Sequence, residues 1–191
     1  MTKAFILTAI LACSIVLTTN AQIQRGNIMV GGDIANFDLG LDKGGLFIIS
    51  LDPKLAFFLR DNLALGGYLT LGITTAKEAG TNINYGIGAL GRYYFSESQL
   101  ELVRHSRFFV EANAGIEGTN PANGENTNGL GVGIGPGWTY FLTNSVGLEA
   151  LVKYRGIVGF GSRPTSSNLN LNVGFQIYLP TSGLKQRLEG K

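Results

Sequence analysis

The chain has 191 residues and a formal net charge of +2, a balance of charges that excludes the strongly basic surface typical of nucleic-acid binding. Glycine is abundant at 28 residues, but 5 prolines and a hydrophobic fraction of 45% are not the composition of a disordered chain. The single cysteine, Cys13, excludes an internal disulfide.

The N-terminal stretch MTKAFILTAILACSIVLTTNAQIQ has the features of a secretory signal peptide. Lys3 supplies a positive flank, an apolar core runs from Ala4 to Leu17, and small residues up to Ala21 suit cleavage. We therefore expect a signal peptide at residues 1–21. A retained membrane helix and lipidation at Cys13 are the alternatives, but the apolar run is short for a span and Cys13 lies in its middle.

Beyond the signal peptide no helical pattern occurs. Apolar and polar residues alternate in eight segments separated by clusters of Asn, Asp, Gly and Ser, which predicts eight strands. Many exceed the usual strand length of about 5–6 residues and reach the roughly 9–11 that a tilted strand needs to cross a bilayer. The predicted strands are Gly26–Phe37, Leu46–Leu59, Leu63–Thr75, Asn82–Phe95, Arg107–Gly118, Asn128–Leu142, Ser145–Val158 and Asn168–Leu179.

The alternation is clearest in the last segment, NLNLNVGFQIYL, at residues 168–179. One face carries only large apolar residues, and the other carries Asn, Gly, Gln and Tyr. Alternation alone fits both a soluble barrel with an apolar interior and a membrane barrel with an apolar exterior. The signal peptide, the strand lengths and the positions of the aromatic residues favour the membrane barrel.

Aromatic residues on the apolar faces gather near the ends of the predicted strands. Rings at both rims are the girdle pattern of outer-membrane barrels, although aromatic residues favour strands in general. The predicted interface residues are Phe57, Tyr93, Phe95, Phe108, Trp138, Tyr140 and Phe175 toward one rim, and Phe47, Tyr85 and Tyr154 toward the other.

Two stretches four strands apart are similar: PKLAFFLRDNLAL, Pro53 to Leu65, and PGWTYFLTNSVGL, Pro136 to Leu148. Each joins a proline, an aromatic pair with leucine, a polar turn and the start of the next strand. An eight-stranded cylinder would carry the two hairpins on opposite sides, and the prolines predict a bend near the same rim, because proline removes a ladder hydrogen bond. Chance similarity between two hairpins is the alternative.

The chain resembles the small outer-membrane β-barrel family of Gram-negative bacteria, particularly its Bacteroidota type. The resemblance rests on NAQIQRGNIMVGG at the mature start, the two proline–aromatic–leucine units, and GALGRYYF at 88–95. It implies an all-β fold, a closed eight-stranded antiparallel up-and-down transmembrane β-barrel at residues 22–180 followed by a tail at 181–191. The expected partners are outer-membrane lipid and the barrel-insertion machinery, and the expected state is a monomer.

An unpaired backbone group in hydrocarbon costs several kcal/mol, so the sheet has to close, and an even number of strands leaves both termini in the periplasm. Periplasmic turns are expected at Arg60–Asn62, Ser96–Ser106 and Thr143–Asn144. Outer loops are expected at Gly40–Gly45, Ala76–Thr81, Thr119–Thr127 and Gly159–Ser167.

A barrel of eight strands has room only for side chains in its interior. Charges of both signs there are expected to pair into a polar plug, since an isolated buried charge is very costly. The predicted inward ion-pair residues are Asp33, Asp52, Lys54, Arg92, Glu111, Glu117, Glu149, Lys153 and Arg155.

The sequence offers no catalytic constellation, and neither a cofactor nor a metal is expected. The only histidine, His105, lies beside Ser106 with no fixed acid partner, and adjacent residues rarely form a nucleophile and base. Glu111 and Glu149 are expected to be ion-pair partners rather than paired catalytic acids. The function expected is a structural or adhesive outer-membrane barrel; the alternatives are a soluble lipocalin-like barrel with an apolar ligand, a narrow pore, or an enzyme.

Overall fold

A computed structural model describes residues 23–39, 47–76, 80–95, 105–161 and 165–181. These residues form eight strands: β1 (Ile28–Leu39), β2 (Phe47–Arg60), β3 (Leu63–Ala76), β4 (Gly80–Tyr94), β5 (Ser106–Asn120), β6 (Thr127–Phe141), β7 (Val146–Gly159) and β8 (Ser166–Leu179). The predicted signal peptide, Cys13, the loop Gly40–Gly45, nearly all of the turn Ser96–Ser106 and nearly all of the tail lie outside the described residues.

Within the described part of the chain, no helix is long and apolar enough to cross a membrane.

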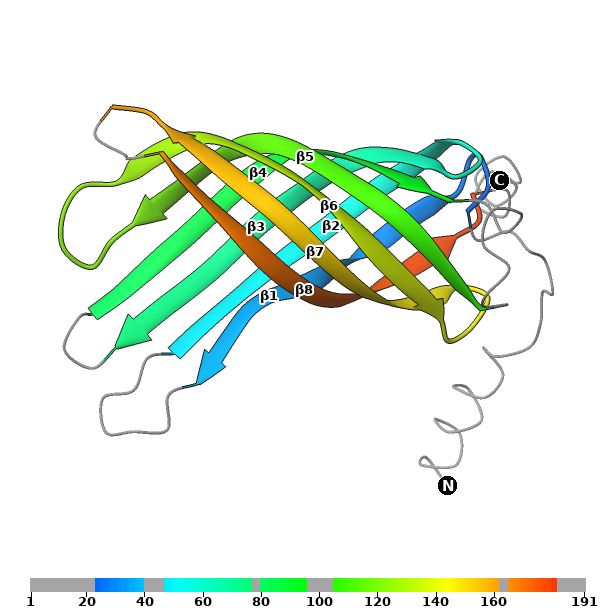
Figure 1. The fold of residues 1–191 in the computed structure, drawn as a ribbon, viewed down its shortest axis with the longest axis horizontal. Helices are drawn as coiled ribbons and strands as arrows, with labels where there is room; N and C mark the ends of the chain where they lie inside the picture. Colours follow the sequence, from blue (N-terminus) through cyan, green and yellow to red (C-terminus); the bar gives the residue numbers. More distant parts are fainter. Residues whose placement is uncertain (1–22, 40–46, 77–79, 96–104, 162–164, 182–191) are drawn as a thin grey trace, which may run out of the picture.

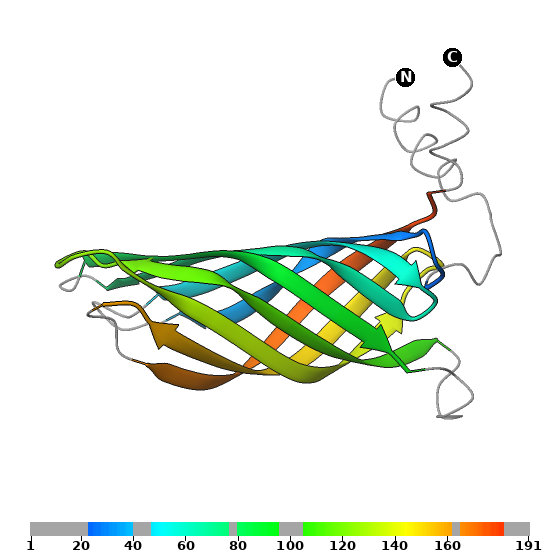
Figure 2. The ribbon, with the colours of Figure 1, turned by 90° about the horizontal axis from the view of Figure 1, so that it is seen from above.

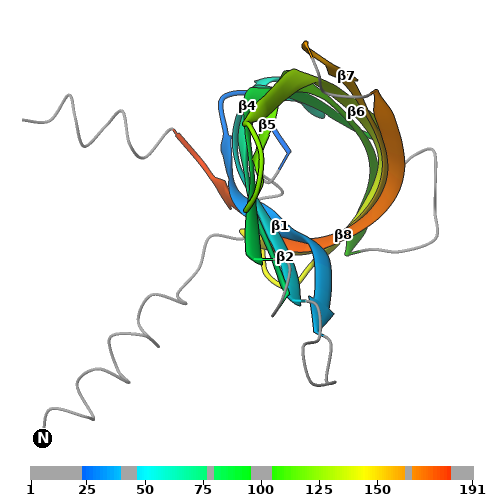
Figure 3. The same cartoon turned by 90° about the vertical axis from the view of Figure 1, so that its left-hand side faces the viewer.

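Each strand pairs antiparallel with the next, and β1 pairs with β8, so the sheet closes into a barrel (Figure 1). The predicted closed eight-stranded antiparallel up-and-down barrel is therefore confirmed. The view along the barrel shows the strands forming a ring (Figure 3). The β2–β3 and β6–β7 turns lie at the same end as the first and last described residues, here called the terminal end, and the β5–β6 connection lies at the opposite, loop end (Figures 1 and 2).

The strands alternate between an exposed apolar face and a buried face that is largely polar. In β6 the alternation is uninterrupted from Asn128 to Phe141. The period of two turns successive side chains to opposite faces of a strand, so closure directs every second residue into the lumen. The exposed face carries leucine, isoleucine, valine and aromatic residues on all eight strands.

Both prolines named in the sequence comparison interrupt a ladder at equivalent places. The β2–β3 pairs stop at Leu51 and resume at Lys54, which leaves out Pro53, and the β6–β7 pairs stop at Ile134 and resume at Gly137, which leaves out Pro136. Proline has no amide hydrogen to donate, so a missing pair at each position is expected. The two hairpins lie four strands apart in the ring, on opposite sides of the barrel.

The joint between β1 and β8 is the shortest ladder in the ring. It pairs Ile28–Ala35 with Asn172–Leu179, and β1 shifts register with β2 just beyond Ala35. Among the described ladder pairs, residues 166–171 of β8 pair with β7 alone. The barrel is therefore closed by fewer backbone hydrogen bonds at this joint than elsewhere, at its loop end.

The segment Ile23–Asn27 folds over the terminal end before β1 begins. The amide of Gly26 donates to the Phe58 carbonyl at 2.8 Å, and the amide of Asn62 donates to the Ile23 carbonyl at 3.0 Å. Ile23 itself is buried in the hydrophobic cluster at this end of the lumen. Backbone hydrogen bonds thus tie the start of the described chain to the β2–β3 turn.

Candidate functional site

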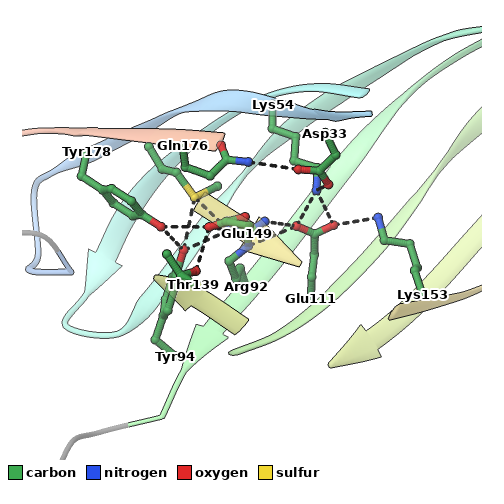
Figure 4. Close-up of polar contacts among 11 residues, drawn as sticks. Asp33, Lys54, Arg92, Tyr94, Glu111, Thr139, Glu149, Lys153, Gln176 and Tyr178 are labelled. Atoms are coloured by element: carbon green, nitrogen blue, oxygen red, sulfur yellow. Dashed lines mark hydrogen bonds and ion pairs between the residues drawn. The ribbon is translucent and has the colours of Figure 1, made fainter. Parts of the chain in front are cut away.

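All nine charged residues predicted to face inward point into the lumen. Eight are less than 7% exposed, and Arg155 is partly buried, with 15% of its side chain exposed. Three zones follow one another along the axis: an aromatic cluster at the terminal end, an ion network in the middle, and a cavity at the loop end. The ion network consists of Asp33, Lys54, Arg92, Glu111, Glu149 and Lys153 (Figure 4).

Arg92, on β4, lies at the centre of the ion network and has no exposed surface on its side chain. Its Nη1 donates to both oxygens of Glu149 at 2.7 Å, and its Nη2 donates to Glu111 Oε2 at 2.6 Å. Its Cζ lies 4.1 Å from the ring centroid of Phe109, a cation–π distance. One guanidinium thus neutralises two carboxylates from β5 and β7, because its fork of donors reaches both at once.

Glu111 receives three cations. Lys54 Nζ lies 3.0 Å from each of its oxygens, and Lys153 Nζ lies 2.7 Å from Oε1. Lys54 also donates to Asp33 Oδ2 at 2.5 Å. The network therefore runs across the lumen from β1 and β2 to β5 and β7, and it connects strands that are not neighbours in the sheet.

A second, separate ion pair lies nearer the loop end. Arg155 Nη2 lies 2.7 Å from Glu117 Oε1, and Arg155 Nε donates to both carboxylate oxygens at 3.0–3.1 Å. Arg155 also donates to Thr70 Oγ1 at 3.4 Å. Tyr68 Oη also donates to Glu117 Oε1, at 3.4 Å.

Asp52 departs from the sequence-based expectation of an ion pair. Within the described residues it forms no ion pair, although it is only 5% exposed, and its Oδ1 has no hydrogen-bond donor. The cations that share its part of the lumen, Lys153 and Arg155, are bound to Glu111 and Glu117. Asp52 therefore has no ion-pair partner of its own among the described residues, because the neighbouring cations are already paired with other carboxylates.

The terminal end of the lumen is filled by aromatic rings, which the sequence reasoning missed. Tyr94 contacts Phe109 and Tyr178 at centroid distances of 5.5 and 6.4 Å, and Phe141 contacts Tyr178 at 5.4 Å. Phe58 joins the same cluster, 6.0 Å from Tyr94. The signal was present in the doublets FF, YY and YF near this rim, because one ring of each doublet faces out and the next has to face in.

Two tyrosine hydroxyls connect the aromatic cluster to the ion network. Tyr94 Oη and Tyr178 Oη lie 2.8 Å apart, and Tyr178 donates to Glu149 Oε1 at 3.0 Å. Thr139 donates to the same Glu149 oxygen at 2.9 Å. Glu149 is therefore held by Arg92 on one side and by neutral hydroxyl donors on the other (Figure 4).

The glycine run of β6 makes room for larger side chains from β5. A Cβ atom added at Gly137 would overlap the ring of Phe109, and one added at Gly131 would overlap the carboxylate of Glu117. Both glycines line the lumen beside residues that would not fit next to a side chain. Their role is steric, and they belong to no phosphate-binding loop.

A cavity of about 250 Å³ occupies the loop end of the lumen. Its lining is mixed, with Ser50, Asn84, Asn168 and the Glu117–Arg155 pair beside the apolar Ile48 and Ile157. A much smaller cavity, about 10 Å³, lies deeper and borders Asp52. Of these two cavities, the larger lies at the loop end and the smaller lies deeper, toward the ion network.

Seven of the ten predicted interface aromatics are exposed on the outer face. Phe47, Tyr85 and Phe95 are half-buried, and Tyr85 borders the loop-end cavity and donates to Asn128 Oδ1 at 2.9 Å. Trp138 and Tyr140 pack side by side, 5.9 Å between centroids. The exposed members are Phe57, Tyr93, Phe108, Trp138, Tyr140, Tyr154 and Phe175.

The described residues hold no group of three or more His, Cys, Asp and Glu side chains arranged to bind a metal ion. His105 is exposed, and its backbone carbonyl accepts a hydrogen bond from the amide of Phe141. The adjacent Ser106 is buried. Glu111 and Glu149 are both held by Arg92, so each carboxylate already has a charged partner.

Replacing Tyr178 by phenylalanine should lower the free energy of unfolding by about 1.5–3 kcal/mol, the usual contribution of a hydrogen bond to a charged group. The variant removes the donor to Glu149 Oε1 while keeping the ring packed in the cluster. Urea unfolding in detergent micelles measures the change. Tyr140→Phe is the matched control, because Tyr140 is on the outer face, and a loss of equal size there would contradict the role of Tyr178.

No protein-family model matches this chain, and no curated protein matches it in sequence. Solved structures with the same fold include Neisserial surface protein A, 16% identical, with a TM-score of 0.51 over 79% of this chain and 94% of that one. The Yersinia pestis outer membrane protein Ail in a phospholipid bilayer nanodisc is 10% identical, with a TM-score of 0.50 over 80% of this chain and 100% of that one. At these identities the likeness shows the fold, a small closed barrel of eight strands, and fold alone assigns no activity.

Proposed function

We propose that this chain is an integral outer-membrane β-barrel whose apolar outer face contacts lipid and whose ion-paired interior stabilises the barrel. The observation that carries the proposal is the distribution of side chains between the two faces. Leu169, Ile87 and Leu171 are exposed by 72%, 63% and 63%, while Glu111 is 0% and Arg92 is 1% exposed. In water this arrangement would be strongly unfavourable, since it exposes apolar surface and buries charge. Against hydrocarbon the same arrangement is favourable.

The lengths of the strands agree with this proposal. The strands have 12–15 residues, more than the roughly 9–11 residues that a tilted strand needs to cross the hydrocarbon core. The exposed aromatic residues near the strand ends provide rings for the membrane interface, where an amphipathic ring is favourable. Closure of the ring leaves few backbone groups without partners, as a lipid environment requires.

The soluble lipocalin-like alternative needs an apolar pocket inside the barrel. Both cavities described here are lined mainly by polar side chains, and the large apolar residues face outward. The narrow-pore alternative needs a continuous path, but the ion network and the aromatic cluster fill the lumen between the loop-end cavity and the terminal end. The exposed apolar face therefore supports the membrane barrel over both alternatives.

In this proposal the termini face the periplasm, the loop end faces the exterior, and the barrel is a monomer inserted by the barrel-insertion machinery. It has a structural or adhesive role without catalysis. The described charges lie inside the barrel or near its ends, so contacts with the exterior would come from the loop end. The finer assignment to the Bacteroidota type rests on the sequence motifs at 20–32, 53–65, 88–95 and 136–148.

Fractionation of a Gram-negative host that expresses the chain tests the proposal. The protein is expected in the outer-membrane fraction, resistant to extraction with carbonate and soluble only in detergent. It should also migrate differently on denaturing gels with and without boiling, because a closed barrel stays folded in detergent until heated. A soluble periplasmic protein serves as the control. Recovery of the folded chain in the soluble fraction without detergent would contradict membrane integration.

A further inference from the structure

The loop-end cavity lies at the mouth of the barrel, a common place for a ligand site in barrel proteins. Residues from β2, β3, β4, β5, β7 and β8 line its volume of about 250 Å³. This is near the lower end of the roughly 300–1,000 Å³ typical of small-molecule sites, so the cavity fits one small molecule and no oligomer. Such a molecule would enter from the loop end, where the lining residues Ser166 and Asn168 are exposed.

Neutral hydrogen-bonding groups from four strands line much of this cavity. They are the amides of Asn84, Asn168 and Asn170 and the hydroxyls of Ser50, Thr74 and Ser166. Amides and hydroxyls offer both donors and acceptors. A bound anion needs donors and a bound cation needs acceptors, whereas the hydroxyl groups of a sugar both donate and accept. The lining therefore matches an uncharged ligand that carries several hydroxyl groups.

Two of these polar groups meet above a glycine. Ser50 on β2 and Asn84 on β4 both pair with Gly72 of β3. A Cβ atom added at Gly72 would lie 3.4 Å from Ser50 Oγ and 3.6 Å from Asn84 Nδ2. The missing side chain thus leaves both groups at the border of the same space. Asn84 Oδ1 already accepts from Thr119 Oγ1 at 2.9 Å, so its Nδ2 is the atom that can donate to a ligand.

The charged residues of the lining, Glu117 and Arg155, neutralise each other. The contacts of Arg155 with Glu117 and Thr70 use Nε and Nη2. Its Nη1 can donate to a ligand oxygen, and a hydrogen bond from a cation is stronger than one between neutral groups. A ligand with its own charge would find no uncompensated opposite charge in this lining, so its desolvation would be costly.

The cavity also has an apolar part, formed by Ile48 and Ile49 on β2 and by Ile157 on β7. A sugar ring presents C–H groups on its faces and hydroxyl groups around its edge, so it can use both kinds of lining at once. We propose that the loop-end cavity binds a single uncharged monosaccharide unit. The inference goes beyond the proposed function and does not depend on it, because the cavity lies inside the barrel.

The test is a titration of the folded barrel, held in a detergent without a sugar headgroup and followed by saturation-transfer NMR of the ligand. The neutral probes are the methyl α-pyranosides of D-glucose, D-galactose and D-mannose. At least one of them should bind saturably. The methyl glycosides of glucuronic acid and glucosamine, which carry a negative and a positive charge, should bind at least about tenfold more weakly, because the lining does not balance their charge.

Two variants assign the binding to the cavity. Asn168→Leu and Ser50→Ala should each raise the dissociation constant about 2- to 13-fold, the range expected for one lost hydrogen bond between neutral groups. Asn120→Leu is the matched control, because Asn120 is exposed at the end of β5 and does not border the cavity. It should bind the probe like the unmodified chain. The gel migration of unboiled samples confirms that each variant is folded.

Three results would overturn the proposal. The first is the absence of saturable binding by all three neutral probes. The second is binding of a charged glycoside as tight as that of the best neutral probe. The third is a dissociation constant that neither Asn168→Leu nor Ser50→Ala changes, or that Asn120→Leu raises equally, since the probe would then bind outside the cavity.

Discussion

Replacing Arg92 by leucine is expected to lower the free energy of unfolding by about 3–5 kcal/mol, the usual cost of removing one partner from a buried ion pair. The substitution leaves Glu149 without a cation, because the remaining donors to its carboxylate are the hydroxyls of Thr139 and Tyr178. Glu111 is affected less, because Lys54 and Lys153 still contact it. Urea unfolding of the barrel in detergent or lipid vesicles measures the loss.

A second variant separates the effect of charge from the effect of lost packing. Arg92→Leu combined with Glu149→Gln removes one charge of each sign, so the network returns to balance with Asp33, Glu111, Lys54 and Lys153. The double variant should recover more than half of the loss, because it no longer holds an uncompensated carboxylate. A double variant no more stable than Arg92→Leu alone would contradict the electrostatic explanation, as would a single variant within about 0.5 kcal/mol of the unmodified chain.

The strand pattern and the closure of the barrel could be predicted from the sequence because both depend on local features. Alternation with a period of two and the clusters of Asn, Gly and Ser mark each strand and each turn. The last predicted strand, Asn168–Leu179, differs from β8 only at its start, which the structure places at Ser166. Closure then follows if the chain spans a bilayer, because the backbone groups of an open sheet edge would have no water to bond with there.

The partners within the lumen could not be predicted in the same way. The alternation of the sequence predicts that Lys54 faces inward. Its charge partners, however, depend on the stagger of the strands and on the reach of its side chain. Its neighbours across the ladder are Gly31 and Tyr68, whereas its charge partners are Asp33 and Glu111. A contact from β2 to β5 crosses the lumen, and no sequence pattern encodes that distance.

The two proline hairpins also position aromatic rings on both faces of the barrel, which the similarity of their sequences alone did not predict. Phe58 and Phe141 follow the equivalent prolines at the same spacing, and both are buried in the aromatic cluster. The neighbouring outward residues, Phe57 and Tyr140, are exposed. Each hairpin therefore places one ring on the outer face and one ring in the lumen, from opposite sides of the barrel.

Replacing Leu171 by arginine is the most direct test of which face of the barrel contacts lipid. Leu171 is 63% exposed on the outer face, near the middle of β8. An arginine near the bilayer midplane costs about 2–4 kcal/mol, because its charge loses hydration without gaining a partner. The variant should fold into lipid vesicles with a free energy of unfolding lower by that amount, as measured by urea titration.

Asn170→Arg is the matched control, one residue away and on the opposite face. Asn170 is 9% exposed and borders both cavities, so a guanidinium there would extend toward the polar loop-end space and the carboxylate of Asp52. The cost should be smaller than at Leu171, because the new cation faces the polar lumen, where the carboxylate of Asp52 offsets the charge of Lys153, its cross-strand neighbour. Equal losses from the two variants would mean that the leucine face does not contact hydrocarbon.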